Sequence, residues 1–204
     1  MEMTSKAFIG RSKGELINLR NQLDGNDESE RKAAAKRVVS LMRAGENLSC
    51  LFSSMFRCVT TNDIELRKLA YHYIITYAPD EPEQSIMAVN FFIQDSQNPN
   101  PLIRALAVRT MCRIRVAAVA EYILPALKTT LTDKAPYVRK TAALAVAKLY
   151  DIIPETVEDS RILSILVKMI HDENPMVVSN AFTAIIEINE HRTSPIFEFN
   201  EKTV

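Results

Sequence analysis

Residues 95–116 read DSQNPNPLIRALAVRTMCRIRV, and this stretch decides the fold class of the chain. The pair Asn100-Pro101 predicts a helix start, because asparagine can cap a first turn and proline at the first helical position sacrifices no hydrogen bond. Three apolar residues follow at spacings of four and three, which places them on one helix face. They are Ala107, Met111 and Ile114. The stretch therefore predicts an amphipathic helix that begins at Pro101.

The same outline recurs along the whole chain. Copies aligned on the column of Arg104 are separated by 36, 37, 35 and 39 residues, and they start at Glu28, Ile64, Pro101, Pro136 and Pro175. Three places after this column every copy has an alanine: Ala34, Ala70, Ala107, Ala142 and Ala181. Two further columns hold apolar residues: Val38, Ile74, Met111, Val146 and Ile185, then Leu41, Tyr77, Ile114, Leu149 and Ile188. The alanine column predicts the place where a neighbouring helix approaches closely, and a larger residue there would overpack the core.

Second helices are predicted between the copies, near residues 47–59, 83–95, 119–132 and 160–172. Pro125 lies within the third of them, where it should kink the helix or mark its first turn. A further helix over 13–23 would turn Leu16, Ile17, Leu19 and Leu23 toward the core. Two helices in each unit of 35–40 residues are typical of HEAT and armadillo arrays. We therefore predict an all-α, right-handed α-solenoid of about five HEAT/armadillo-like helix pairs.

The expected domain organisation follows from these boundaries. Residues 1–12 are polar and mixed, which predicts an extended N-terminal arm, and 13–191 form the solenoid. Residues 192–204 should be an irregular tail. The last copy has no polar cap after it, so we expect this tail to be the truncation of a longer array.

Composition points away from several classes of protein. The net charge is zero, but it is unevenly distributed. Residues 101–150 include nine basic and two acidic side chains, whereas residues 151–204 include four basic and ten acidic ones. A nucleic-acid-binding domain would be basic as a whole, so we expect no nucleic acid. Cys50, Cys58 and Cys112 are odd in number, lack CxxC spacing and lie in helical apolar patterns, which predicts reduced core thiols in a cytosolic protein. We find no motif for a metal, a cofactor or a catalytic residue, and we predict that the chain is not an enzyme.

Two groups of arginines are candidate sites. Arg67, Arg104 and Arg139 fall in one repeat column, where they form either a ligand-binding row or a structural ladder with Asp133 and Asp172 as acceptors. Arg109, Arg113 and Arg115 lie outside the column. With Lys128, Lys134 and Lys140 they form either a surface for an anionic partner or an ordinary solvated face.

Several stretches resemble one family over most of the chain. PNPLIRALAVRTMCRIRV at 99–116, PYVRKTAALAVAKLYDI at 136–152 and NPMVVSNAFTAIIEI at 174–188 are similar to the amino-terminal trunk of β-adaptins. These proteins are the large β subunits of heterotetrameric clathrin adaptor complexes. KGELINLRNQL at 13–23 and IMAVNFFIQD at 86–95 resemble the trunk too.

The resemblance implies a non-enzymatic scaffold in vesicle-mediated intracellular protein transport. The implied partners are the second large, medium and small adaptor subunits and an Arf-family GTPase. Ile86 and Val89 match GTPase-contact positions, where they would be partly exposed apolar anchors or core residues. Lipid-contacting positions of the family match Lys6, Lys13 and Arg37, and also three residues that are acidic here: Asp27, Glu28 and Glu30.

The implied location is cytoplasmic and peripheral, on coated vesicles of the trans-Golgi, endosomes or plasma membrane. Clathrin binding would belong to a hinge that these residues do not include. The alternative hypothesis is another HEAT-repeat scaffold, such as a coatomer-type coat subunit or a nuclear transport receptor fragment. An unrelated enzyme is the third class, and a pocket that joins titratable residues from several repeats would favour it.

Overall fold

The computed structural model describes residues 3–80, 82–114 and 119–197, and within them every regular element is a helix. The chain divides into two compact units, residues 1–81 and 82–204. Within the described residues no helix is both long and apolar enough to cross a membrane.

The described part of the first unit contains four α-helices and two short 3-10 helices. Its elements are α1 (Met3–Asp24), α2 (Glu28–Arg43), η1 (Ser49–Leu51), α3 (Phe52–Arg57), η2 (Cys58–Thr60) and α4 (Ile64–Tyr77). α2 packs on α1 and α4, and α3 packs on α1 and α4. The second helix predicted near 47–59 is thus a short α-helix with a 3-10 turn at each end.

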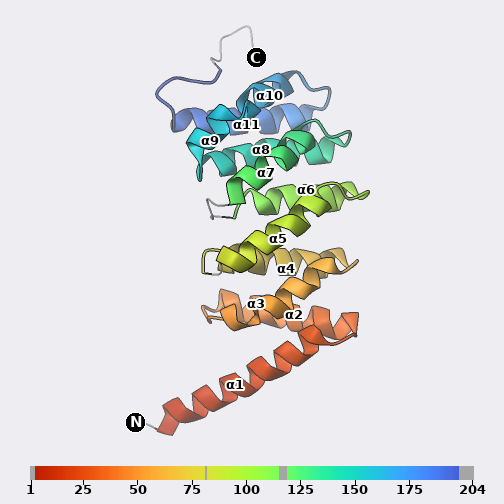
Figure 1. Cartoon of the computed structure of the whole chain (residues 1–204), viewed down its shortest axis with the longest axis vertical. Coiled ribbons are helices and arrows are strands. Elements are labelled where there is room, and N and C mark those ends of the chain that lie inside the picture. Colours follow the sequence, from red (N-terminus) through yellow and green to blue (C-terminus); the bar gives the residue numbers. More distant parts are fainter. Residues whose placement is uncertain (1–2, 81, 115–118, 198–204) are drawn as a thin grey trace. The chain divides into compact units, whose positions relative to one another are not determined.

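The second unit contains three helices that stack in parallel and a layer that covers them. Its described elements are α5 (Pro82–Asp95), α6 (Pro101–Met111), α7 (Ala120–Leu131), α8 (Pro136–Tyr150), α9 (Pro154–Asp159), α10 (Ile162–Lys168), η4 (Met169–His171) and α11 (Pro175–Glu190). α8 packs between α6 and α11, and all three begin at the same edge of the unit (Figure 1). Each helix of the stack therefore presents equivalent repeat positions side by side.

Helix starts follow the predicted capping chemistry. The Asn100 side chain accepts a hydrogen bond from Leu102 N–H at 2.9 Å, and Asn174 accepts one from Met176 N–H at 3.0 Å. Asp27 and Asp63 cap α2 and α4 in the same way. Ala135 provides no side-chain cap for α8, and Asp133 instead accepts the N–H of Ala135 itself at 2.8 Å.

The repeat columns form the core of both units. Every alanine of the alanine column and every residue of the two apolar columns is buried. Alanine has no side chain beyond Cβ, so the backbones of adjacent helices can approach closely at these positions. The period read from the sequence thus matches the burial pattern of the folded chain.

Two expectations about the first helix need correction. The extended arm predicted for residues 1–12 is wrong for the described part, because α1 begins at Met3 and runs unbroken to Asp24. No proline interrupts that segment, so a helix can extend toward the N-terminus as a polar continuation of its packed end. Ile17 was predicted to face the core but is exposed, while Leu19 and Leu23 are buried.

The covering helices α5 and α7 lie within one residue of the predicted ranges 83–95 and 119–132, whereas the last covering helix differs from its prediction. Pro125 is the sixth residue of α7, which continues to Leu131, so it does not mark the first turn. The helix predicted over 160–172 is shorter and is preceded by α9. Arg161 joins α9 to α10 in the left-handed region, with φ of 62°. A residue other than glycine thus takes up the left-handed backbone between the two helices.

The segment after α11 is irregular up to the last described residue. The Asn189 side chain accepts the N–H of Ile196 at 2.8 Å and donates to the carbonyl of Phe197 at 3.3 Å. Arg192 bonds to the Glu158 carboxylate and to the carbonyl of Ser194. Residues 198–204 of the predicted tail lie outside the described residues.

Candidate functional site

The arginine column forms a ladder of paired charges in the second unit. Arg104 donates two hydrogen bonds to the carboxylate of Asp133, from Nε at 2.7 Å and from Nη2 at 2.8 Å. Its Nη1 donates to the carbonyls of Asn98 and Pro99 at 2.8 and 3.0 Å. One guanidinium therefore ties the loop before α6 to the loop before α8.

The next copy repeats this geometry. Arg139 donates to Asp172 at 2.7 and 2.8 Å, and its Nη1 donates to the carbonyls of Asp133 and Lys134. In the first unit Arg67 donates to the carbonyl of Thr61 at 3.1 and 2.5 Å. Each of these arginines is buried or half-buried and donates hydrogen bonds to backbone carbonyls. This geometry favours a structural ladder over a ligand-binding row.

The ladder sets the protonation of its members. Burial by itself would raise the pKa of Asp133, but hydrogen bonds from Arg104 and from the N–H of Ala135 outweigh it and hold that pKa below its ordinary value. Hydrogen bonding to Arg139 lowers the pKa of Asp172. The pKa values of Arg104 and Arg139 are raised by the same bonds. All four groups are therefore charged at neutral pH.

The basic residues outside the column are placed differently. Arg109 and Arg113 are exposed on α6 and just after it, and Arg115 lies outside the described residues. Among the described side chains neither Arg109 nor Arg113 has an ion-pair partner. Lys140 on α8 lies 5.0 Å from the ring centroid of Tyr137. These cations remain available to a partner of opposite charge.

The two GTPase-contact candidates separate on α5. Ile86 is 41% exposed, whereas Val89 is buried at 1% exposure. Val89 is therefore a core residue and not a partly exposed anchor, because its side of α5 faces the helices packed against it. Met87, which the sequence did not single out, is 60% exposed beside Ile86.

Of the three candidate lipid-binding residues in the first unit, only Arg37 has a described side chain. The side chains of Lys6 and Lys13 lie outside the described part of the structure. Arg37 is exposed, and its Nε and Nη2 bond to Glu15 at 2.9 and 2.8 Å. The sequence pattern gave no indication of that pair, because the two residues come from different helices.

A second charged cluster was also missed. Lys32 of α2 bonds to Asp63 at 2.8 Å and to Glu65 at 2.5 Å, and Lys36 bonds to Glu65 at 2.8 Å. These contacts link successive repeats in the first unit. A signal for this cluster was present in the sequence. Lys32 and Lys36 are four residues apart on one helix face, and two acidic residues, Asp63 and Glu65, follow one repeat later.

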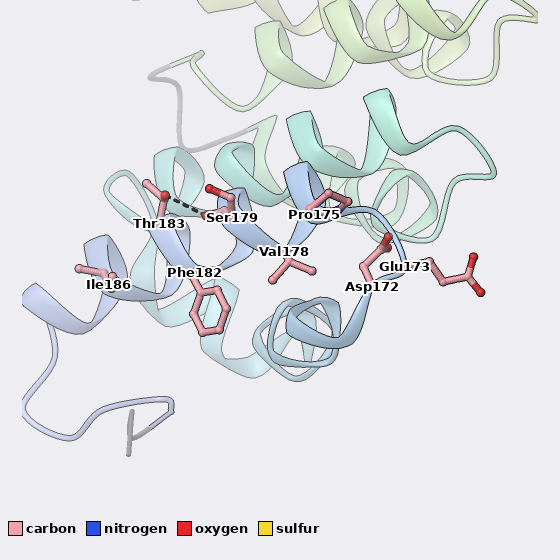
Figure 2. Close-up of a pocket in the computed structure, with 8 residues that line it drawn as sticks. All are labelled: Asp172, Glu173, Pro175, Val178, Ser179, Phe182, Thr183 and Ile186. Atoms are coloured by element: carbon pink, nitrogen blue, oxygen red, sulfur yellow. Dashed lines mark hydrogen bonds between the residues drawn. The ribbon is translucent and has the colours of Figure 1, made fainter. Parts of the chain in front are cut away.

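A shallow groove lies along α11, on the side away from α8. It has a volume of about 610 Å³ and is lined by Asp172, Glu173, Pro175, Val178, Ser179, Phe182, Thr183 and Ile186. Figure 2 shows Val178 and Phe182 on the same side of the helix. Val178 occupies the arginine column, so this copy lacks the cation that Arg104 and Arg139 supply to theirs. The groove holds carboxylates at one end only and does not resemble a catalytic cleft.

The remaining reactive groups are not arranged for chemistry. Within the described residues no three His, Cys, Asp or Glu side chains cluster as they would around a metal ion. Burial raises the pKa of the Cys58 thiol to about 11 and raises that of Cys112 as well. Cys50 is exposed. The prediction of core cysteines therefore holds for Cys58 and Cys112 and is wrong for Cys50.

Comparison with known families gives a match to the adaptin N terminal region over residues 10–202. The chain is 45% identical to the AP-1 complex subunit beta-1 of Homo sapiens over 98% of its own length. It is 45% identical to the AP-1 complex subunit beta of Dictyostelium discoideum over 96%, and 37% identical to beta-adaptin-like protein A of Arabidopsis thaliana over 86%. The chain spans about a fifth of the length of these relatives, 21% or 22% in each case.

Solved structures agree on the architecture. A designed armadillo repeat protein matches 92% of the chain with a TM-score of 0.58 at 20% identity, covering 84% of that protein. A second one, solved in complex with peptide (KR)4, matches 84% with a TM-score of 0.59, covering 80% of that protein at 20% identity. The predicted HEAT/armadillo-like all-α class is confirmed.

Proposed function

The chain belongs to the adaptin N-terminal region family, and from this premise we propose that it is a non-enzymatic scaffold segment of a clathrin-associated adaptor complex. Its role would be in vesicle-mediated intracellular protein transport. The observation that carries the proposal is the 45% identity, over 98% and 96% of this chain, to AP-1 β subunits of Homo sapiens and Dictyostelium discoideum. The alternative hypothesis is a coatomer-type or nuclear transport scaffold.

The proposed mechanism is the display of a rigid helical surface to partner subunits. Stacked helix pairs joined by the Arg104–Asp133 and Arg139–Asp172 contacts keep repeat edges in fixed register. A scaffold of this kind binds through surfaces that exist before the partner arrives, so little ordering entropy is lost on association. The proposed partners are the second large, medium and small subunits of an adaptor complex.

Assembly with those subunits is the direct test. We would co-express the tagged chain with the other three subunits of a human AP-1 complex and measure co-purification and stoichiometry by size exclusion. The matched N-terminal segment of human AP-1 β1 serves as the positive control. We expect the chain to recover at least one of the three subunits. Failure of the chain to recover any of them, while the control does, would contradict the proposal.

Contact with an Arf-family GTPase is a finer proposal on the same scaffold. It rests on the match of Ile86 to a contact position and on the exposure of Ile86 and Met87 on α5. Ile86→Asp should abolish binding of the chain to the GTP-bound GTPase. Binding to the GDP-bound GTPase should be negligible with and without the substitution. Ile17→Asp, at another exposed isoleucine, is the matched control. Equal binding by both variants and the unaltered chain would remove Ile86 from the contact.

Peripheral attachment to anionic membrane is proposed through Lys6, Lys13 and Arg37, on coated vesicles of the trans-Golgi, endosomes or plasma membrane. Each basic residue near such a surface contributes about 1 kcal/mol. The acidic residues Asp27, Glu28 and Glu30 and the Arg37–Glu15 pair oppose that attraction. We therefore expect weak, salt-sensitive binding to phosphoinositide vesicles, measured by co-sedimentation. Clathrin is proposed to bind only through other parts of a longer adaptin.

A further inference from the structure

Three exposed apolar side chains occupy the same repeat position on the parallel stack. Leu102, Tyr137 and Met176 each follow the proline that starts α6, α8 and α11, and they are 48%, 47% and 53% exposed. Because the three helices are adjacent, these half-exposed apolar side chains are arranged in a row across the stack. We call these three residues the apolar row.

The three helices begin at the same edge of the stack (Figure 1), and each residue of the apolar row is the second residue of its helix. Packed helices lie about 8–10 Å apart, so neighbouring side chains of the row are separated by about that distance. A partner α-helix rises about 10.5 Å in seven residues. One apolar residue in every heptad of such a helix would therefore meet the row in register.

Three cations without an ion-pair partner in the described part of the chain lie on the same stack as the apolar row, two of them toward the far end of α6. Arg109 is seven residues beyond Leu102, hence on the same side of α6 two turns away, and Arg113 follows just after the helix ends. Lys140 lies over the Tyr137 ring on α8. We call Arg109, Arg113 and Lys140 the basic group. Among the described side chains it has no ion-pair partner, whereas Lys148, further along α8, is paired with Glu187.

The stack adds a further positive contribution. Three helix N-termini point to the edge where the apolar row lies, and each carries a partial positive charge. Segment 101–150, which holds α6 and α8, has nine basic and two acidic residues, whereas 151–204, which holds α11, has four basic and ten acidic residues. Charge complementarity at α6 and α8 therefore favours a partner that is acidic as well as apolar.

We propose that the apolar row and the basic group of the α6–α8–α11 stack form a docking surface for an acidic amphipathic helix of a partner protein. The helix lies across the stack, with an apolar residue in each of three heptads on Leu102, Tyr137 and Met176. Its carboxylates face the basic group. The Lys140–Tyr137 contact holds the ring in place before binding, which lowers the entropy lost on association.

A synthetic peptide tests the surface on the purified 204-residue chain. The probe is a fluorescein-labelled helical peptide of roughly 15 residues, with leucine at every seventh position and glutamate and alanine elsewhere. One reference peptide has alanine in place of leucine, and another has lysine in place of glutamate. Fluorescence anisotropy should give saturable binding of the probe that weakens with salt, and at least about tenfold weaker binding of both references.

Variants of the chain locate the binding. We expect Tyr137→Ala to lower the affinity for the probe peptide about tenfold or more. The double variant Arg109→Glu with Arg113→Glu should have an effect of the same size. Tyr122→Ala on α7 and Lys168→Glu on α10 change exposed residues that lie outside this surface. Their affinity for the probe peptide should stay within about twofold of that of the unaltered chain. Thermal unfolding of each variant should match the unaltered chain, since every substituted side chain is exposed.

Several results would overturn the proposal. These are no saturable binding, equal binding of the alanine reference peptide, or unchanged affinity in the Tyr137 and arginine variants. Phosphatidylserine vesicles provide the remaining arm. If the arginine variant abolishes vesicle binding while peptide binding persists unchanged, the surface is a membrane contact. The experiment uses no adaptor subunit, so its outcome and that of the assembly test are independent.

Discussion

The Arg104 guanidinium binds the Asp133 carboxylate through two hydrogen bonds of 2.7 and 2.8 Å across 29 residues of sequence. Their side chains are 7% and 11% exposed. The same arginine bonds to two carbonyls of its own loop, so the contact fixes one repeat to the next through main chain as well as charge. Removal of either partner would leave a buried charge without compensation.

Asp133→Ala should destabilise the chain by about 3 kcal/mol or more, because Arg104 would remain buried and charged. Chemical denaturation followed by circular dichroism gives the free energy of unfolding. Glu187→Ala removes the exposed Lys148–Glu187 pair and is the matched control, with an expected loss below about 1 kcal/mol. Equal losses in the two variants would contradict the structural role assigned to the ladder.

Acid should weaken the fold through the same carboxylates. The pKa values of Asp133 and Asp172 are lowered in the folded chain, so they stabilise it above the unfolded pKa of about 3.9. That contribution is lost as the pH falls through the lower folded values. The melting temperature should therefore drop below about pH 4, and the drop should be smaller in the variant Asp133→Asn with Asp172→Asn. An unchanged acid profile in that variant would assign the effect to other groups.

The alanine column should not tolerate a larger side chain. Ala34 is buried on α2, which packs against α1 and α4, so Ala34→Leu should cost about 1–3 kcal/mol through overpacking. Ala33→Leu, at the preceding residue on the exposed side of α2, should change stability by less than about 0.5 kcal/mol. Thermal unfolding compares the two. Comparable losses would mean that close helix approach is not what selects alanine at position 34.

Two glycines should respond in opposite directions to alanine. Gly45 ends α2 with φ of +91°, and the N–H groups of Gly45 and Glu46 bond to Met42 and Leu41 carbonyls. Gly45→Ala should cost about 1 kcal/mol because of the left-handed backbone, although an added Cβ meets no atom. Gly14 lies inside α1 with open space around it, so Gly14→Ala should stabilise by about 0.5–1 kcal/mol. Denaturant unfolding of each variant gives the change in the free energy of unfolding. If both substitutions changed it in the same direction, backbone conformation would not explain the two effects.

Cysteine reactivity should follow burial. Cys50 is exposed, whereas burial raises the pKa of Cys58 to about 11 and that of Cys112 also. At neutral pH a thiol reagent should therefore label Cys50 rapidly, and the other two only on the timescale of unfolding. Peptide mapping by mass spectrometry after a short pulse identifies the site. Rapid labelling of Cys112 in the native chain would show that α6 opens locally.

The sequence by itself determined the repeat and its core. A period of 35–39 residues, the alanine column and the Asn-Pro starts are local patterns, and local propensity and apolar periodicity act through residues that are near in sequence. The acceptors Asp133 and Asp172 were predictable for the same reason, since each precedes a copy start at a fixed spacing. The β-adaptin resemblance was likewise contained in contiguous runs of residues.

Only the tertiary structure decided which faces remain uncovered. Val89 and Ile86 share one apolar helix, but packing in the second unit buries the first and leaves the second exposed. The Arg37–Glu15 pair joins two different helices, and the apolar row exists because three helices stack in parallel. Such features depend on contacts between segments distant in sequence, which no periodicity encodes. The stretch at 95–116 thus predicted its own helix, while the stack around that helix decided what Leu102 and Arg109 present to a partner.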